Sequence, residues 1–170
     1  MKLVLINGPS CAGKSTAVDS VMKNKENYFR LSYDSIKWSF SNYVAFKYSD
    51  EIYNLMLIIM NEMCRVKFDI ICDSVIFKEH RQELTEVAEK YGYKIVSINL
   101  EANYDIVLTR YEQRKKEIAE NLHKEPTHTS LEKFKELFDR YHNEKDPDAV
   151  TFDTGKQTQE EVSTEVLALL

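Results

Sequence analysis

Short apolar runs and longer amphipathic stretches alternate along the whole chain. The run 3–6 contains only Leu, Val and Ile, which is typical of a strand buried on both faces of a parallel sheet. Four further runs have the length and composition of strands. The predicted strands are 3–6, 28–33, 69–72, 94–100 and 149–152.

The stretches between these runs have the periodicity of helices. From about 50 to 67, apolar residues recur at i, i+3, i+4 and i+7, which predicts a helix with one buried face. The other predicted helices are 15–23, a turn over 34–38, one that Gly92 ends, one from about 103, one that 146–147 breaks, and a last one that carries Val162, Val166, Leu169 and Leu170. Because strands and helices alternate, we expect a single α/β domain over residues 1–170, with a parallel sheet covered on both faces.

A polar segment interrupts this pattern between residues 115 and 128. Thr129 with Glu132 then forms a predicted capping box for the helix that follows. The segment carries few apolar residues that a core could hold. We therefore expect residues from about 111 to 128 to form a mobile lid.

Charge and cysteine content narrow the range of functions. The formal net charge is −5, whereas a protein that depends on nucleic-acid backbone contacts is more often basic. The balance favours a small-molecule or protein substrate. Three cysteines without framework spacing favour reduced thiols and a cytoplasmic location. No stretch approaches the roughly 18 apolar residues of a membrane span, and the first apolar run is too short for a signal peptide.

The segment after the first strand matches the phosphate-loop pattern G-x-x-x-x-G-K-[ST] at every fixed position. Its glycines allow a tight turn that aims backbone N–H groups at phosphates, and the next helix begins at the loop's end. Lys14 is expected to reach the β- and γ-phosphates of ATP, and Ser15 to hold Mg²⁺. The predicted nucleotide-binding residues are Gly8, Pro9, Ser10, Cys11, Ala12, Gly13, Lys14, Ser15 and Thr16.

Two aspartates follow the second and third predicted strands. Asp34 and Asp73 are expected near the γ-phosphate, because ligands bind at the carboxyl ends of parallel strands. Asp34, which begins the predicted helix that carries Lys37, is the candidate base for an acceptor hydroxyl, and Asp73 is the candidate ligand of Mg²⁺; the reverse assignment stays open. Asp34 also suits a helix N-cap, and Asp73 a strand-end turn.

Three arginines are further candidates. Arg110 and Arg114 lie four residues apart on a predicted helix and project from one face toward the expected lid. Guanidinium groups there could stabilise charge on a phosphoryl group in transfer, although a solvated basic helix face gives the same pattern. Arg81 could line an acceptor pocket or lie on the surface.

The order of these motifs resembles the small P-loop kinases of the polynucleotide-kinase, zeta-toxin and chloramphenicol-phosphotransferase group, which are AAA-type predicted kinases. The resemblance rests on the phosphate loop with Thr16, the segments 31–37 and 70–74, Arg81, and the pair Arg110 and Arg114. It implies a three-layer sandwich with sheet order 2-3-1-4-5 and a helical lid. It also implies that Asp34 activates the acceptor, that Lys37 contacts it, and that Arg110 belongs to the lid, with Arg114 as a second candidate. Many relatives have arginine at the position of Lys37.

The leading hypothesis is an enzyme that moves the γ-phosphoryl group of ATP to a hydroxyl of a small molecule. A polynucleotide or nucleoside 5′-hydroxyl kinase is an alternative, for which Trp38, Phe40 and Tyr43 could contact a base; core packing also explains these aromatic residues. An alternative of another class is a nucleotide-dependent switch or binding module. No N-K-x-D motif follows an apolar strand, which disfavours a GTPase. The sequence does not identify the acceptor, the preferred nucleoside triphosphate or the oligomeric state.

Overall fold

A parallel five-stranded sheet forms the centre of the computed structural model, which describes residues 1–44, 46–120 and 130–170. The strand order is β2-β3-β1-β4-β5, as the resemblance implied, and each neighbouring pair is parallel. The strands are β1 (Lys2–Asn7), β2 (Tyr28–Leu31), β3 (Asp69–Cys72), β4 (Lys94–Glu101) and β5 (Val150–Asp153). Each lies within two residues of a predicted strand.

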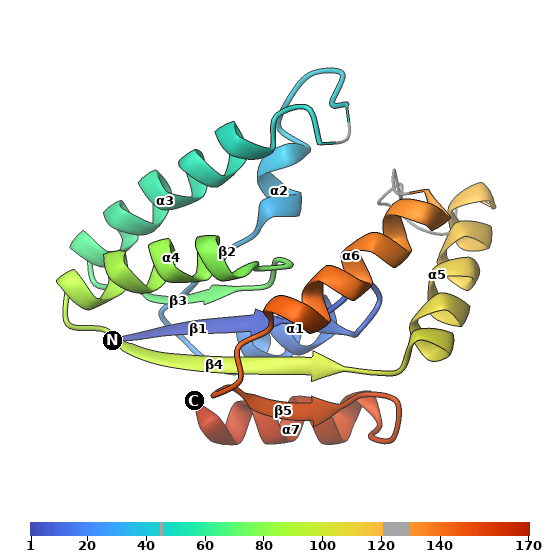
Figure 1. Cartoon of the computed structure of the whole chain (residues 1–170). Coiled ribbons are helices and arrows are strands. Elements are labelled where there is room, and N and C mark those ends of the chain that lie inside the picture. Colours follow the sequence, from blue (N-terminus) through green and yellow to red (C-terminus); the bar gives the residue numbers. More distant parts are fainter. Residues whose placement is uncertain (45, 121–129) are drawn as a thin grey trace.

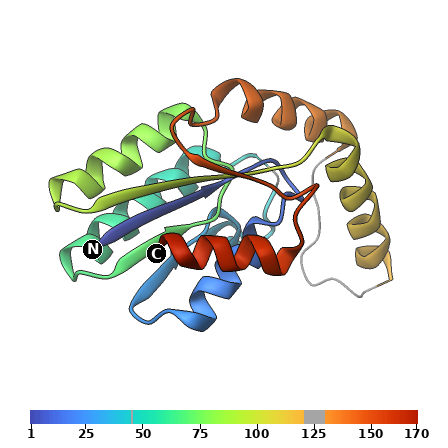
Figure 2. The ribbon, with the colours of Figure 1, turned by 90° about the horizontal axis from the view of Figure 1, so that it is seen from below.

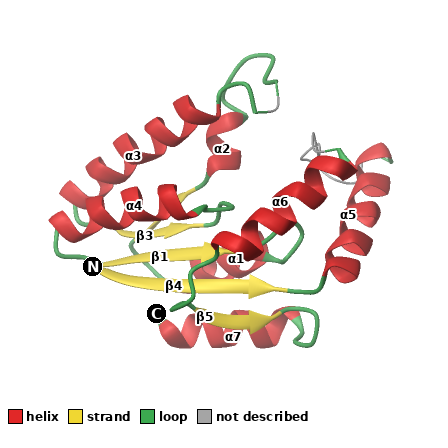
Figure 3. Ribbon diagram, in the orientation of Figure 1, coloured by secondary structure: helices red, strands yellow, loops and turns green. Residues whose placement is uncertain are grey.

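Helices cover both faces of the sheet (Figures 1 and 3). On one face, α3 (Ser49–Arg65) and α4 (Lys78–Lys90) pack on a cluster that includes Leu3 and Leu5 of β1. On the other face, α1 (Lys14–Asn24) and α7 (Gln159–Leu169) lie side by side over Val4 and Ile6 (Figure 2). Successive residues of β1 thus enter opposite core clusters, so the apolar run reflects a strand buried on both faces.

A third apolar cluster lies beside the carboxyl ends of the strands. It joins α5 (Tyr104–Ala119) to α6 (Leu131–Glu144), and the rings of Tyr111 and Phe134 have centroids 4.4 Å apart. Cys11 of the phosphate loop packs against the same cluster. The two helices therefore stand next to the loop (Figure 1).

Two helix starts differ from their prediction. The short helix α2 (Tyr33–Lys37) is capped by Ser32, whose Oγ accepts a hydrogen bond from Ser35 N, so the N-cap interpretation of Asp34 is wrong. Ser130 caps α6 by accepting a hydrogen bond from Lys133 N at 3.2 Å. The expected cap Thr129 lies outside the described residues.

Only part of the expected lid, residues 111–128, lies among the described residues. Residues 111–119 continue α5 as a regular helix, and 121–128 lie outside the described residues. The lid therefore stays a prediction. Among the described helices, none combines the length and the apolar composition that a membrane crossing requires.

Parallel strand direction brings the predicted site residues to one edge of the sheet. Cys72 of β3 pairs with Leu5 of β1 on one side and with Leu31 of β2 on the other. The segments that leave these three strands begin close together. They carry the phosphate loop, α2 with Asp34, and Asp73.

Candidate active site

The phosphate loop has a backbone that only certain residues tolerate. Gly13 has φ 92° and is the N-cap of α1, and Cys11 also has a positive φ of 64°. Gly8 is required for a different reason: a Cβ built there would lie 2.4 Å from the carbonyl oxygen of Leu100 in β4. The loop is therefore packed directly against the end of β4, and it leads into the N-terminus of α1, where backbone N–H groups favour an anion.

Lys14 folds back over this loop. Its Nζ donates hydrogen bonds to the carbonyl oxygens of Gly8 at 2.9 Å and Pro9 at 2.8 Å. Burial lowers the pKa of Lys14, and the nearby charges of Asp34 and Asp73 oppose that shift. The structure thus brings the three predicted residues into one electrostatic neighbourhood. A phosphate in the loop would give the ammonium an anionic partner that the carbonyls do not supply.

Asp73 is the most buried carboxylate of the site, with a side chain that is 2% exposed. Its Oδ2 pairs with the guanidinium of Arg30 in β2, and its Oδ1 has no hydrogen-bond partner among the described residues. Leaving such an oxygen buried is costly unless another group binds it. Asp73 is thus anchored at one oxygen and available at the other.

The side-chain oxygens of Ser15 and Asp73 are of a chemical kind that suits a magnesium ion. A hydroxyl and a carboxylate, from Ser15 and Asp73, are hard ligands of the kind Mg²⁺ prefers, and Mg²⁺ usually binds few protein groups together with substrate phosphates. Within the described parts of the chain, no cluster of three or more His, Cys, Asp or Glu side chains could hold a metal alone. The arrangement fits a metal whose remaining ligands come from a nucleotide and water.

Asp34 is largely exposed, with 55% of its side chain accessible to solvent. It forms an ion pair with Lys37 one turn further along α2. The start of α2 is held in place because Tyr33 N donates to Ser74 Oγ at 3.0 Å. Since Ser74 follows Asp73, this bond couples the positions of the two aspartates.

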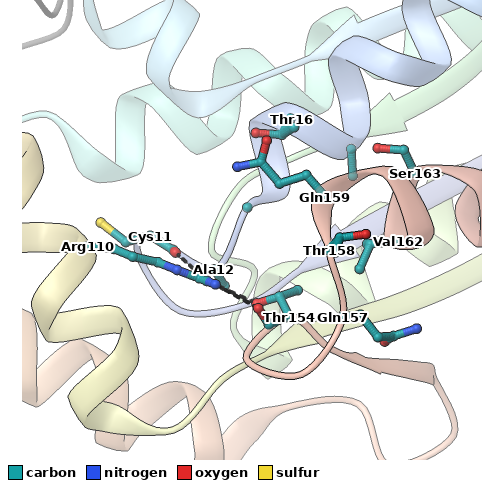
Figure 4. Close-up of a pocket in the computed structure, with 12 residues that line it drawn as sticks. Cys11, Ala12, Thr16, Arg110, Thr154, Gln157, Thr158, Gln159, Val162 and Ser163 are labelled. Atoms are coloured by element: carbon teal, nitrogen blue, oxygen red, sulfur yellow. Dashed lines mark hydrogen bonds between the residues drawn. The ribbon is translucent and has the colours of Figure 1, made fainter.

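Arg110 bridges the phosphate loop and the loop after β5 (Figure 4). Its Nη1 donates to Cys11 O at 3.4 Å and to Thr154 Oγ1 at 3.1 Å, and its Nη2 donates to Thr154 O at 2.6 Å. In this structure the guanidinium thus joins the phosphate loop to the segment after β5, and the lid role implied by the resemblance stays a prediction.

Arg114, one turn beyond Arg110 on α5, lies beside the thiol of Cys11. Burial raises the pKa of Cys11, and the hydrogen bond and positive charge of Arg114 oppose that shift. Arg114 is also close enough to Lys14 to affect its pKa. Of the two arginines, Arg114 therefore lies in the same charged group as Lys14.

A pocket opens between the phosphate loop and the segment after β5 (Figure 4). Arg110 and Thr154 form one wall, and Thr16 with Ala17 of α1 another. Gln157, Thr158 and Gln159 add polar groups from the start of α7. The pocket is continuous with the phosphate loop, so a nucleotide whose phosphates occupy the loop could extend into it.

Arg81, in the first turn of α4, contacts residues at and just after the end of α6. Its Nη1 donates to the carbonyl oxygen of Glu144 at 3.0 Å, and its Nε is 4.0 Å from the carboxylate of Asp146. Only 15% of its side chain is exposed. In this structure Arg81 ties α4 to the end of α6; its role toward an acceptor stays a prediction.

Three polar residues of the site were missed from the sequence. Asn7 forms hydrogen bonds with the backbone of Ile76. Arg30 forms an ion pair with Asp73, and Thr154 accepts hydrogen bonds from Arg110. Asn7 had a detectable signal, because it is a polar residue that directly ends an apolar strand. Arg30 and Thr154 had none, since their partners are distant in sequence.

The fold and the phosphate loop together define a small P-loop kinase. The chain belongs to the AAA_33 family (AAA domain), whose model matches residues 3–141. No curated protein has a significant sequence match to it.

Solved structures of small-molecule kinases share the whole fold. APS kinase of Mycobacterium tuberculosis, in complex with AMPPNP and APS, is 18% identical with a TM-score of 0.69, covering 99% of this chain and 96% of that one. A sugar kinase from Janibacter sp. HTCC2649 is 14% identical with a TM-score of 0.65, covering 99% and 93%. Shikimate kinase from Aquifex aeolicus is 15% identical with a TM-score of 0.60, covering 98% and 94%. At these identities the likeness concerns the fold.

Proposed function

We propose that the protein transfers the γ-phosphoryl group of ATP to a hydroxyl of a small-molecule acceptor, with Mg²⁺. The observation that carries this proposal is the convergence of Lys14, Asp34 and Asp73 at the phosphate loop, where both carboxylates affect the pKa of the lysine. A positive group for the phosphates, an exposed carboxylate and a buried carboxylate are the parts that phosphoryl transfer to an alcohol needs.

Each side chain has a defined task in this proposal. The exposed Asp34 takes the proton from the acceptor hydroxyl. The oxygen of that hydroxyl bonds to the γ-phosphorus, and ADP leaves. Lys14 stabilises negative charge on the transferring group, and Arg114 adds a second positive charge. Ser15 and Asp73 would hold Mg²⁺, which would supply positive charge to the phosphates. The base of the nucleotide would occupy the pocket beside Arg110.

A small acceptor is favoured over a nucleic acid. The net charge is −5, and Lys37, the basic residue nearest to Asp34 in sequence, is paired with that aspartate. The sugar kinase and APS kinase with the same fold act on small molecules, which supports the same class here. The half-buried ring of Trp38 packs edge-on against Tyr43, with centroids 5.6 Å apart, so it is engaged within the protein.

Transfer from labelled ATP to a panel of hydroxyl acceptors tests the proposal. The panel contains sugars, nucleosides, hydroxylated antibiotics, amino alcohols and an oligonucleotide with a free 5′-hydroxyl. We expect label on a small molecule, dependent on Mg²⁺ and absent with Lys14→Ala. Label on the oligonucleotide alone would establish the 5′-hydroxyl kinase instead. Slow ATP hydrolysis that ignores every acceptor would favour a nucleotide-dependent switch.

A further inference from the structure

An arginine in the edge strand β2 connects two aspartates on neighbouring elements. The Nη1 of Arg30 lies 2.7 Å from Asp19 Oδ1 on α1, and its Nη2 pairs with Asp73 Oδ2 after β3. The three side chains thus form a row from α1 across β2 to the end of β3. Neither Arg30 nor Asp19 belongs to the phosphate loop, and neither has a task in the proposed transfer.

Burial explains why Asp73 needs this partner. Its side chain is 2% exposed, whereas that of Asp19 is 66% exposed. A buried carboxylate without a cation is strongly disfavoured in its charged form. The guanidinium of Arg30 is that cation, because it contacts Asp73 directly and is itself paired with Asp19.

The row lies next to the residue expected to bind the metal. Asp19 follows Ser15 by four residues on α1, so the two share one face of that helix. In the sheet, Leu31 of β2 pairs with Cys72 of β3. Arg30 directly precedes Leu31, and Asp73 directly follows Cys72. Arg30 thus connects Asp19, one turn after Ser15 on α1, to Asp73 after β3.

The two oxygens of Asp73 have different surroundings. Oδ2 is bound to Arg30, while Oδ1 is buried and has no hydrogen-bond partner among the described residues. A carboxylate held at one oxygen cannot rotate freely, so its other oxygen has a defined direction. Residues that hold a metal ligand in this way often affect metal affinity nearly as strongly as the ligand itself.

We propose that Arg30 is the residue that positions Asp73 for magnesium. It occupies Oδ2, is itself held by Asp19, and leaves Oδ1 for the ion or for a water bound to it. The row carries one net negative charge, which suits a divalent cation. A guanidinium suits this role better than an ammonium, because its two terminal nitrogens contact the two aspartates separately, whereas lysine has a single nitrogen. This inference rests on the proposed use of Mg²⁺ with a nucleotide.

Nucleotide binding tests the proposal without any acceptor. The dissociation constant of the ATP analogue AMPPNP is measured by calorimetry over a series of Mg²⁺ concentrations and in EDTA. For Arg30→Gln we expect the Mg²⁺ midpoint to rise about tenfold or more, as for other lost partners of metal ligands. The affinity in EDTA should be unchanged, because Arg30 does not touch the phosphate loop. Arg30→Lys should fall between this variant and the wild type.

Matched variants separate positioning from general damage. Arg65→Gln removes an exposed arginine that pairs with Glu62 at the end of α3, and it should keep the wild-type midpoint. Asp19→Asn changes a largely exposed side chain and should raise the midpoint less than Arg30→Gln does. If Arg30→Gln does not fold, by circular dichroism, Arg30→Lys and Asp19→Asn decide the question.

The possible results have distinct meanings. A wild-type midpoint in folded Arg30→Gln, or a lower one, would overturn the positioning role; a lower one would show that Arg30 competes with the metal. A wild-type protein that binds AMPPNP with no response to Mg²⁺ would remove both this inference and the proposed metal. Mg²⁺-dependent binding without transfer to any acceptor would remove the proposed reaction and leave the role of Arg30 standing.

Discussion

The side chain of Asn7 forms a pair of hydrogen bonds with the backbone of Ile76. Its Nδ2 donates to Ile76 O at 2.8 Å, and its Oδ1 accepts from Ile76 N at 2.9 Å. The same Oδ1 accepts from Gly8 N at 2.9 Å, and the side chain is buried. The last residue of β1 thus joins the start of the phosphate loop to the segment that carries Asp73.

Replacing Asn7 with Ala should destabilise the protein. The change leaves Ile76 N, Ile76 O and Gly8 N buried without their partners, which predicts a loss of about 2–4 kcal/mol in the free energy of unfolding. Urea denaturation measures this quantity. Asn24→Ala, which removes an exposed hydrogen bond within α1, is a suitable control and should cost less than about 1 kcal/mol. Equal losses in the two variants would contradict the bridging role.

Replacing Lys14 with Ala should abolish productive use of ATP. Its ammonium lies over the loop carbonyls where the phosphates are expected, and losing such a contact costs about 3–4 kcal/mol or more in the transition state. Steady-state kinetics with the identified acceptor gives the loss in kcat/KM. Lys25→Ala, at the far end of α1, is the control. Transfer by Lys14→Ala near the wild-type rate would refute the proposed phosphotransferase.

Asn variants of the two aspartates should separate their tasks. Asp34→Asn keeps the size of an exposed side chain and removes the base, so kcat should fall about 10²- to 10⁴-fold with ATP affinity nearly unchanged. The helix should survive, because Ser32 caps it. Asp73→Asn should instead weaken the response to Mg²⁺, with partial rescue at high metal concentration. Normal turnover by Asp34→Asn together with an inactive Asp73→Asn would exchange the two assignments.

Lysine variants should distinguish Arg110 from Arg114. Lysine cannot replace the three hydrogen bonds of Arg110 to Cys11 and Thr154, so Arg110→Lys should lower the free energy of unfolding by about 1–3 kcal/mol and weaken nucleotide binding. Arg114→Lys should lower kcat more than nucleotide affinity, since Arg114 lies beside Lys14. Calorimetry and steady-state kinetics on both variants check the distinction. A lower kcat with intact nucleotide binding in Arg110→Lys would instead indicate that Arg110 stabilises the phosphoryl group in transfer.

His80 should make stability depend on pH. Burial lowers the pKa of His80, whose ring stacks on Tyr53 with centroids 3.5 Å apart. The folded state therefore binds its proton less well than the unfolded state, which has a pKa of about 6.5. The stabilising contribution is present above pH 6.5 and is lost as the pH falls through the folded pKa.

Urea denaturation between pH 8 and 5 measures this contribution. His80→Phe keeps a stacked ring without a titrating group, so the variant should lose less stability than the wild type as the pH falls below about 6.5. Parallel curves for the two proteins across this range would show that His80 does not contribute.

The local pattern predicted the elements well because it depends on near neighbours in the chain. The run 70–72 is apolar on both sides of its backbone, and a strand buried on both faces is the structure that accommodates it. The phosphate loop was equally readable, because its glycines satisfy local backbone requirements. Local pattern was less reliable for caps: Ser32 and Asp34 both suit an N-cap, and the helix begins after Ser32.

The sequence by itself determined the strands, most of the helices, the phosphate loop and the candidate carboxylates, since each depends on residues within a few positions of one another. Only the tertiary structure decided which groups hold these residues in place. Arg30 and Asp73 are separated by 43 positions, and Arg110 and Thr154 by 44. Their contacts arise because parallel strands bring distant segments to one edge of the sheet, where burial of a charge demands a partner that no local pattern specifies.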